Sequence, residues 1–239
     1  MAGTWTDPDV PIWDLPERGE RGPRLRHSRA QVASAAISIA DAEGIAAVTM
    51  RRLAAELGTG TMSLYNYVPA KEHLVQLMAD QAAGEYVYPP STPPDRRTAI
   101  ADLARQGRDI ARRHPWLLAV MQPPPPMGPC TLRYIDYFLG LLADTRLDTA
   151  AKMESIAVIN GFAVMYGGMQ AGLDAERART GISEEEQQAA PVKILAKAAA
   201  TGTYPNLAAA LTAPQSRPRT ADRNFESCLV RLIDGALAG

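Results

Sequence analysis

Residues 49–71 have the sequence TMRRLAAELGTGTMSLYNYVPAK, and this segment predicts two short helices joined by a tight turn. In its first half, apolar residues recur at i, i+3, i+4 and i+7, as on one face of a helix; they are Met50, Leu53, Ala54 and Leu57. Thr49 can cap this helix, and Gly58 can close it in the left-handed conformation. The second run, TMSLYNYV, stops at Pro69, which cannot continue a helix. This arrangement is typical of a helix-turn-helix.

The second short helix is rich in side chains suited to reading DNA. Tyr65, Asn66 and Tyr67 form a cluster that a solvent-facing helix has little reason to carry. Asparagine can form two hydrogen bonds with adenine, and tyrosine can reach a phosphate or a thymine methyl in the major groove. The alternative is that the tyrosines only cap a small core.

The longer segment TMRRLAAELGTGTMSLYNYVPAKEHLVQLM, together with the preceding ADAEG, resembles the DNA-binding signature of the tetracycline-repressor (TetR) family of bacterial regulators. The shared features include the LY-aromatic pair and the lysine that opens the next helix. The resemblance implies DNA contacts from Arg51, Thr61, Met62, Tyr65, Asn66, Tyr67 and Lys71. Lys71, at a helix N-terminus, is expected to hold a phosphate with help from the helix dipole.

Composition and charge place limits on the class of protein. The chain has 239 residues, of which 46% are hydrophobic and 6% aromatic, and this balance favours helices packed on helices. A net charge of −1 argues against a globally basic surface, so DNA binding must depend on a local patch. Residues 1–27 are expected to be a flexible basic arm, with Arg18, Arg21 and Arg24, that follows phosphates or enters the minor groove. The other interpretation is a solvated tail, from which Trp13 can fold back on the domain.

The chain divides into two helical domains. Residues 28–87 are expected to form the DNA-binding bundle, with a capping box at Ser28 and Gln31 and a helix end at Gly44. The prolines between Pro89 and Pro94 form a linker, and residues 95–239 form a larger domain. Within it, the proline-rich residues 122–129 are either a rigid connector or a ligand for a partner protein.

Two helices expected in the larger domain bury apolar side chains differently. Residues 131–143 have one apolar face, made of Leu132, Ile135, Leu139 and Leu142. Residues 148–179 are apolar on every side between Ile156 and Met165, so this helix needs a second neighbour, either a partner subunit or a ligand. Gly161, Gly167 and Gly168 would let another helix approach closely.

The motif HPW, a G-x-YP segment and the last helix, FESCLVRLIDGALA, resemble the actinobacterial branch of the same family. This resemblance implies a homodimer in which the long helix near 150–179 and the last helix, 223–237, pair with those of a second subunit. The expected fold is all-α, with an N-terminal helix-turn-helix bundle and a larger C-terminal helical domain for ligand binding and dimerisation.

Several residues of the larger domain are aromatic or adaptable apolar residues with a few polar handles, as in small-molecule pockets. The candidates are Trp116, Met121, Tyr134, Phe138, Asn160, Phe162, Met165, Tyr166, Met169 and Tyr204. About half of them are expected to contact a ligand, because sequence fixes such sites weakly.

The sequence does not predict an enzyme, a metal site or a cofactor. His27, His73 and His114 are not spaced with another histidine or a carboxylate as a metal or acid–base pair, and His73 and His114 are expected at the surface or as capping residues. Cys130 and Cys228 lie far apart and are expected to be reduced. The chain has neither a long uninterrupted apolar run nor a signal-peptide pattern, so a cytoplasmic protein without membrane contact is expected.

The expected function is that of a ligand-responsive transcriptional repressor. It would bind a palindromic double-stranded DNA operator and be released by a small apolar or amphipathic effector. Two alternatives are a regulator controlled by a protein partner, and a helical ligand-binding protein without a specific operator.

Overall fold

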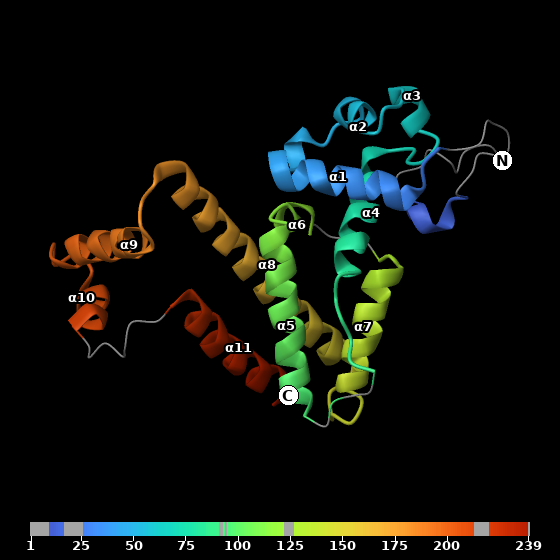
Figure 1. Ribbon diagram of the computed structural model, residues 1–239. Helices are drawn as coiled ribbons and strands as arrows, with labels where there is room; N and C mark the ends of the chain where they lie inside the picture. The colour runs from blue at the N-terminus through green and yellow to red at the C-terminus, as the bar shows by residue number, and fades with distance from the viewer. Residues whose placement is uncertain are drawn as a thin grey trace.

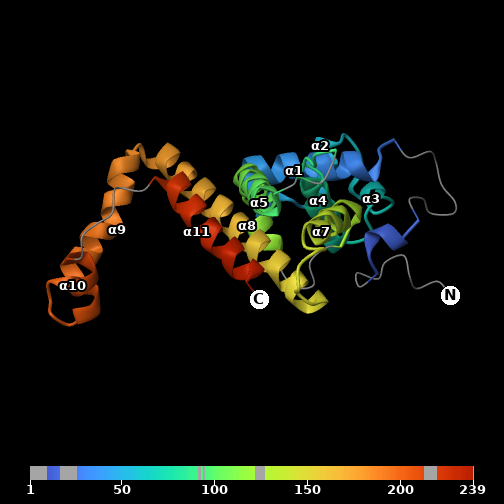
Figure 2. The same cartoon turned by 90° about the horizontal axis from the view of Figure 1, so that it is seen from below.

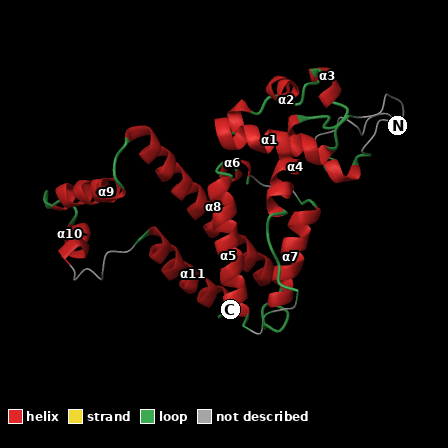
Figure 3. Ribbon diagram, viewed as in Figure 1, coloured by secondary structure: helices red, strands yellow, loops and turns green. Residues whose placement is uncertain are grey.

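The computed structural model describes residues 10–16, 26–90, 93, 95–121, 127–212 and 220–238, and its regular elements are all helices (Figures 1 and 3). The N-terminal bundle comprises α1 (Arg29–Glu43), α2 (Met50–Glu56), α3 (Thr61–Leu64) and α4 (Lys71–Ala83). The C-terminal domain comprises α5 (Arg96–Arg113), α6 (Leu117–Val120), α7 (Pro129–Leu141), α8 (Thr149–Thr180), α9 (Glu184–Ala199), α10 (Pro205–Thr212) and α11 (Ala221–Leu237). The all-α fold expected from the sequence is confirmed.

Local signals set the helix ends in the N-terminal bundle. Ser28 and Gln31 form the predicted capping box of α1, with a distance of 3.2 Å from the Gln31 backbone nitrogen to Ser28 Oγ. The Thr49 hydroxyl accepts a hydrogen bond from the backbone of Arg52 and caps α2. Gly44 and Gly58 have φ angles of 84° and 60°, which a side chain would strain. Gly58 thus permits the compact turn between α2 and α3, whereas Gly44 ends α1.

Residues 10–16 are folded, so the prediction of a flexible arm up to residue 27 is wrong for this part. A 3-10 turn (η1, Ile12–Asp14) buries Ile12 completely against the bundle. The Arg29 guanidinium donates to the carbonyl oxygens of Ile12, Leu15 and Pro16, at 2.9, 3.0 and 2.8 Å. These bonds fasten the segment to the start of α1. Arg18, Arg21 and Arg24 lie outside the described residues.

Two cores hold the molecule together. The first fills the N-terminal bundle but also includes Trp116, Leu117 and Val164 from the C-terminal domain. The second joins α5, α7, α8 and α11 around Phe138 and Phe225. Because the first core crosses the boundary between the domains, the bundle is anchored on α5, α6 and α8.

The long helix α8 is buried on one side. Ile156, Ile159 and Ala163 are buried, whereas Val158, Met165 and Met169 are each about half exposed, at 52%, 50% and 49%. The prediction of burial all round is therefore not met within one chain. By length and composition α8 also resembles a membrane-spanning helix, a test that core helices of soluble proteins pass as well. Here α8 packs mainly on α5, with further contacts to α6, α7 and α11.

The predicted apolar face of α7 is confirmed in part. Leu142 is completely buried, and Ile135 and Leu139 pack partly buried against the core, but Leu132 is exposed. The buried side chains within α7 include Tyr134 and Phe138, whose large aromatic rings gain more from burial than Leu132. Helical spacing alone could not separate the two neighbouring faces of α7, because both carry apolar residues three and four apart.

Helices α9 and α10 form an arm that projects from the end of α8, away from the N-terminal bundle (Figure 2). A capping box at Ser183 and Glu186 starts α9. Neither helix has a buried residue, and Val192, Ile194 and Tyr204 are exposed. The arm therefore leaves apolar side chains exposed in one chain.

Candidate DNA-binding surface and ligand cavity

Helix α3 presents a short polar and apolar surface at the outer edge of the bundle. Leu64 and Val68 are completely buried and fix α3 on the bundle. Met62, Tyr65 and Asn66 are exposed, and Thr61 is half-buried at the first position of the helix. Figure 1 shows α2 and α3 on the side of the bundle away from α7 and α11. A duplex could approach this surface without meeting the C-terminal domain.

Tyr67 does not belong to that surface. Its side chain is only 4% exposed, and its hydroxyl accepts hydrogen bonds from the backbone nitrogens of Arg26 and His27, at 3.1 and 3.3 Å. The predicted DNA contact from Tyr67 is therefore replaced by a structural role. Ser63, which sequence reasoning missed, is exposed beside Met62. The sequence signal for Ser63 is its position in the helical repeat, between the exposed residues Met62 and Tyr65.

Two cations flank α3. Arg51 is exposed in the first turn of α2, while its neighbour Arg52 is held by Glu43 and Glu56 at 2.8 and 2.7 Å. Lys71 is exposed at the first position of α4, where Ala70 offers no side-chain cap. The first-turn N–H groups of α4 thus point to an open end that suits a phosphate.

The prediction of a surface or capping position is wrong for His73, whereas His114 is the C-terminal cap of α5 and is buried as well. His73 is completely buried, and its Nε2 lies 3.0 Å from the carbonyl oxygen of Val10. His114 is 7% exposed, with Nδ1 2.8 Å from Asp41 Oδ1 and Nε2 2.8 Å from Glu85 Oε1. These carboxylates are 73 and 29 residues away in the sequence, so no local spacing could reveal them.

His114, Trp116, Asp41 and Glu85 form an interdomain joint. The indole nitrogen of Trp116 donates to Asp41 Oδ1 at 2.7 Å, so two residues of the C-terminal domain bind one carboxylate of α1. Both His114 nitrogens donate to carboxylates when the ring carries two protons. Burial tends to raise the pKa of Glu85, but hydrogen bonds from Arg113 and His114 outweigh burial and hold that pKa below its usual value. The joint therefore holds the Glu85 carboxylate between Arg113 and His114 at the domain boundary.

A second polar link joins the bundle to α7. Asp80 of α4 is buried, and its carboxylate accepts hydrogen bonds from the backbone nitrogens of Thr131 and Cys130, at 2.9 and 3.2 Å. The α4 carboxylate thus caps the N-terminus of α7. Movement of α4 must therefore carry α7 with it or break these bonds.

The predicted ligand residues divide into several groups. Trp116, Tyr134, Phe138 and Tyr166 are buried in the cores. Asn160 and Phe162 are half-buried; Asn160 accepts a hydrogen bond from Tyr86, and Phe162 stacks on Phe225. Met121, Met165, Met169 and Tyr204 are exposed. The structure thus does not bring the ten candidates together into one pocket.

Part of the buried group is an aromatic cluster beneath α7. The rings of Tyr86 and Tyr134 lie 4.6 Å apart, and Tyr134 contacts Phe138 edge-on. Burial raises the pKa of Tyr134 well above its usual value, so this phenol stays neutral. Tyr88 extends the cluster, and burial raises its pKa to about 12. The packing of these rings gives them a core role.

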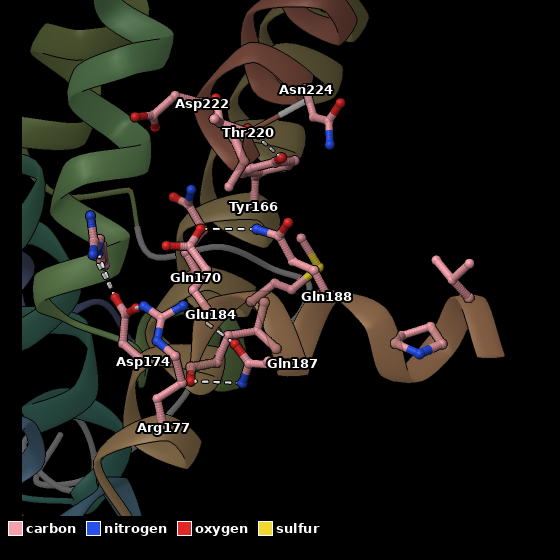
Figure 4. Close-up of a pocket in the computed structure, with 16 residues that line it drawn as sticks. Tyr166, Gln170, Asp174, Arg177, Glu184, Gln187, Gln188, Thr220, Asp222 and Asn224 are labelled. Atoms are coloured by element: carbon pink, nitrogen blue, oxygen red, sulfur yellow. Dashed lines mark hydrogen bonds and ion pairs between the residues drawn. The ribbon is translucent and has the colours of Figure 1, made fainter. Parts of the chain in front are cut away.

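A cavity of about 920 Å³ lies between α8, the first half of α9, the start of α11 and the end of α5; we call it the Gln170 cavity (Figure 4). Of the predicted ligand residues, Tyr166 and Met169 line it. Figure 4 shows Asp174 and Arg177 of α8 facing Gln187 of α9, with Asp222 of α11 at the other end. Sequence reasoning missed Gln170 because a glutamine in an apolar helix gives no motif.

Comparison with known proteins identifies the family. The family model described as "Bacterial regulatory proteins, tetR family" matches residues 32–78, and the model "Tetracyclin repressor-like, C-terminal domain" matches residues 89–238. The HTH-type transcriptional repressor DrrR1 of Streptomyces coeruleorubidus is 39% identical over 202 residues, which cover 82% of this chain and 73% of DrrR1.

Solved structures agree with this match. Apo ActR from Streptomyces coelicolor is similar with a TM-score of 0.70 and 25% identity, over 90% of this chain and 98% of ActR. ActR in complex with actinorhodin is similar with a TM-score of 0.73 and 24% identity, over 90% and 98% of the two chains. The chain therefore belongs to the TetR family of bacterial transcriptional regulators.

Proposed function

We propose that the protein is a repressor that binds a palindromic operator as a homodimer and leaves it when a small effector binds. The observation that carries this proposal is the exposed surface of α3, with Met62, Ser63, Tyr65 and Asn66, between the cations Arg51 and Lys71. The similarity to the repressor DrrR1 supports the direction of regulation. Such a protein acts in the cytoplasm, where the DNA lies.

The exposed residues suit different tasks on DNA. Asn66 can hydrogen-bond an adenine edge, and Met62 and Tyr65 can contact a thymine methyl or a phosphate in the major groove. Lys71 and Arg51 suit phosphates on either side of α3, with Thr61 at its N-terminus. The base contacts would set sequence preference, and the phosphate contacts would set the register of the protein.

The exposed faces of α8 and α11 support dimerisation. Val158, Met165 and Met169 of α8 and Val230 of α11 are exposed apolar side chains. At Gly161 of α8 and Gly235 of α11, an added Cβ would meet nothing within 4 Å in one chain. Helices from a second copy can approach closely at such glycines and cover the apolar side chains. The projecting α9–α10 arm, with no buried residue, suits packing against the same copy.

The release step is a coupling between two sites. ActR binds actinorhodin, and by analogy this chain would bind a small apolar or amphipathic effector in its C-terminal domain. An effector that prefers the geometry unable to bind DNA by a few kcal/mol is enough to empty the operator.

The test is a titration of the purified protein with DNA that flanks its own gene, in the presence of scrambled competitor DNA. Lys71→Ala is expected to weaken binding to every sequence and to lower the salt dependence by about two counterions per dimer, because it removes one phosphate contact from each subunit. Arg146→Ala, an exposed arginine between α7 and α8, is the control and should bind like the unchanged protein. Binding no tighter than to scrambled DNA would count against an operator in that region.

Two other functions make different predictions in the same experiment. A regulator controlled by a protein partner would bind the operator specifically but would not respond to any small molecule. A ligand-binding protein that merely kept the fold would bind DNA with steep salt dependence and no sequence preference.

A further inference from the structure

We propose that the Gln170 cavity binds a neutral amphipathic molecule whose hydroxyl group forms a hydrogen bond with the Gln170 amide. The proposed binding of this molecule does not depend on DNA recognition. Its consequence for operator release rests on the function proposed above.

The first argument is an unmet hydrogen bond. Gln170 is 8% exposed, and its Oε1 is buried without a partner among the described residues. A buried polar atom without a partner is costly, and such atoms in native proteins usually bind water or a ligand. A hydroxyl group donates a hydrogen bond to the Gln170 oxygen, which a molecule with only an ether oxygen cannot do.

Neighbouring polar groups already have partners within the protein. The Tyr166 hydroxyl donates to the carbonyl oxygen of Ala221 at 2.7 Å. The Gln187 amide donates to the carbonyl oxygen of Leu173 at 3.0 Å. The Gln188 amide donates to Glu184 Oε1 at 2.9 Å. Gln170 is therefore the buried amide of this cavity whose oxygen has no partner among the described residues.

The charges and apolar groups of the cavity indicate the class of ligand. Arg112 lies 2.6 Å from Asp174, and Arg177 also bonds Asp174. Glu184 and Asp222 also line the cavity, so two arginines face three carboxylates and the nearly balanced charge does not favour a strongly charged molecule. Met169, Leu173 and Val192 supply apolar wall, and the volume is in the range of small-molecule sites. A neutral molecule with an apolar body and a hydroxyl group fits both features.

Occupancy of the cavity can reach the N-terminal bundle through α5. Arg112 lines the cavity two residues before His114, which binds Asp41 and Glu85 at the interdomain joint. At Gly167 of α8, a Cβ would lie 2.2 Å from the carbonyl oxygen of Arg108, so the two helix backbones touch. A shift of α8 or of Arg112 would therefore displace the C-terminal end of α5, which is followed by His114 of the interdomain joint.

The test uses 2-naphthol, which is neutral at pH 7, and 2-methoxynaphthalene, which has a similar shape but no hydroxyl hydrogen. Binding is followed by NMR of methionine methyl groups in the full-length protein, with Met169 as the reporter inside the cavity. We expect 2-naphthol to shift the Met169 signal and to bind about tenfold more tightly, the effect of about one hydrogen bond. Gln170→Leu should abolish this preference, and Gln170→Met serves if the leucine variant does not fold.

Gln188→Leu is the matched control, because the Gln188 amide lines the same cavity but already pairs with Glu184. This variant should keep the preference for 2-naphthol. Equal affinity of the two probes, an unmoved Met169 signal, or a preference that survives the loss of Gln170 would overturn the proposal. A further outcome would also overturn the proposal: neither probe binds, and Gln170→Leu changes the dimer in sedimentation. A second copy of the chain would then fill the cavity.

The same protein samples separate this proposal from the proposed function. Probe binding with the expected preference, but no specific operator, would leave the cavity assignment standing and remove the repressor. Specific operator binding without probe binding would support the proposed repressor function and rule out the cavity assignment.

Discussion

Tyr67 and Asn66 are neighbours in the chain but face different surroundings. Asn66 is exposed beyond the end of α3, whereas Tyr67 turns into the core and holds the backbone of Arg26 and His27 through its hydroxyl. One step along a helical turn rotates a side chain by about 100°. Adjacent residues therefore have different roles: Asn66 is a candidate base contact, whereas Tyr67 holds the backbone that leads into α1.

This difference predicts opposite results for two substitutions. Asn66→Ala should cost about 1–3 kcal/mol of binding free energy and relax the preference at one base pair, without changing thermal stability. Tyr67→Phe should lower the free energy of unfolding by about 1 kcal/mol, because two backbone donors lose their acceptor, and should leave the base preference unchanged. Binding to single-base operator variants, together with thermal unfolding of both proteins, checks the pair. A relaxed base preference in Tyr67→Phe would show that its assignment to the core is wrong.

The interdomain joint predicts coupled effects at His114 and Asp41. His114→Ala and Asp41→Ala should each lower the free energy of unfolding by about 1–3 kcal/mol, because each removes one partner of the hydrogen bond between these residues at the domain boundary. The double variant should lose less than the sum, with an interaction energy of about 1 kcal/mol. Denaturant unfolding measures this cycle. The exposed pair Arg179 and Glu176 is the control and should give under about 0.5 kcal/mol; equal values for the two pairs would contradict the joint.

At the scale of elements, the fit between α5 and α8 depends on one glycine. Gly167→Ala would place a methyl group 2.2 Å from the carbonyl oxygen of Arg108, so the helices must separate. We expect a loss of about 1–3 kcal/mol in the free energy of unfolding, as for other overpacked contacts. Gly140→Ala on α7 meets nothing within 4 Å and should instead be neutral or slightly stabilising, because alanine favours helix. Thermal unfolding of the two variants decides, and similar stability would refute a tight contact at Gly167.

Helices α5 and α11 are joined by an ion pair that predicts a pH dependence. Arg105 forms two hydrogen bonds of 2.8 Å with the carboxylate of Glu226, and they hold the pKa of Glu226 below its usual value of 4.5. A lowered folded-state pKa means that the carboxylate stabilises the fold above about pH 4.5 and that this gain is lost as the pH falls through the lower value.

Glu226→Gln should therefore reduce stability at pH 7 by under about 1 kcal/mol, a small effect because the pair is partly exposed. The difference from the unchanged protein should shrink as the pH falls below about 4.5. Unfolding by urea across this pH range measures it. A difference that grows towards acid would contradict the assigned sign.

The sequence predicted the helices and their ends better than it predicted the tertiary contacts of their side chains. Ser28, Thr49, Gly44 and Gly58 act on backbone groups within a few residues, so local pattern was enough to place α1, α2 and the turn after it. The partners of His114 depend on how helices far apart in the chain pack. For α7, two neighbouring faces were both apolar, and only the tertiary fit of Tyr134 and Phe138 selected one.

At the scale of the whole molecule, the described part of one chain leaves many apolar side chains exposed. Exposed apolar side chains run along α8, and no residue of α9 or α10 is buried. The arm of α9 and α10 projects away from the N-terminal bundle (Figure 2). A second copy that covers these surfaces would also set the distance between two α3 helices. Dimerisation and operator recognition are then parts of one geometry.

Met165→Arg tests this geometry, because it places a charge on the exposed apolar face of α8. We expect the variant to sediment as a monomer and to lose at least tenfold in operator affinity, since a buried unpaired charge opposes association. Leu132→Arg, at an equally exposed leucine of α7, should remain dimeric. If Met165→Arg remained dimeric as well, the interface would have to lie elsewhere.

The central claim is that two copies of α3 read two symmetric half-sites, and footprinting on the DNA that flanks the gene tests it most directly. The account predicts two protected half-sites with inverted sequence, whose centres are separated by a whole number of helical turns of about 34 Å each. It also predicts that Lys71→Ala loses both half-sites together. Protection of a single asymmetric site, or of the DNA without any sequence preference, would contradict the dimeric operator-binding repressor.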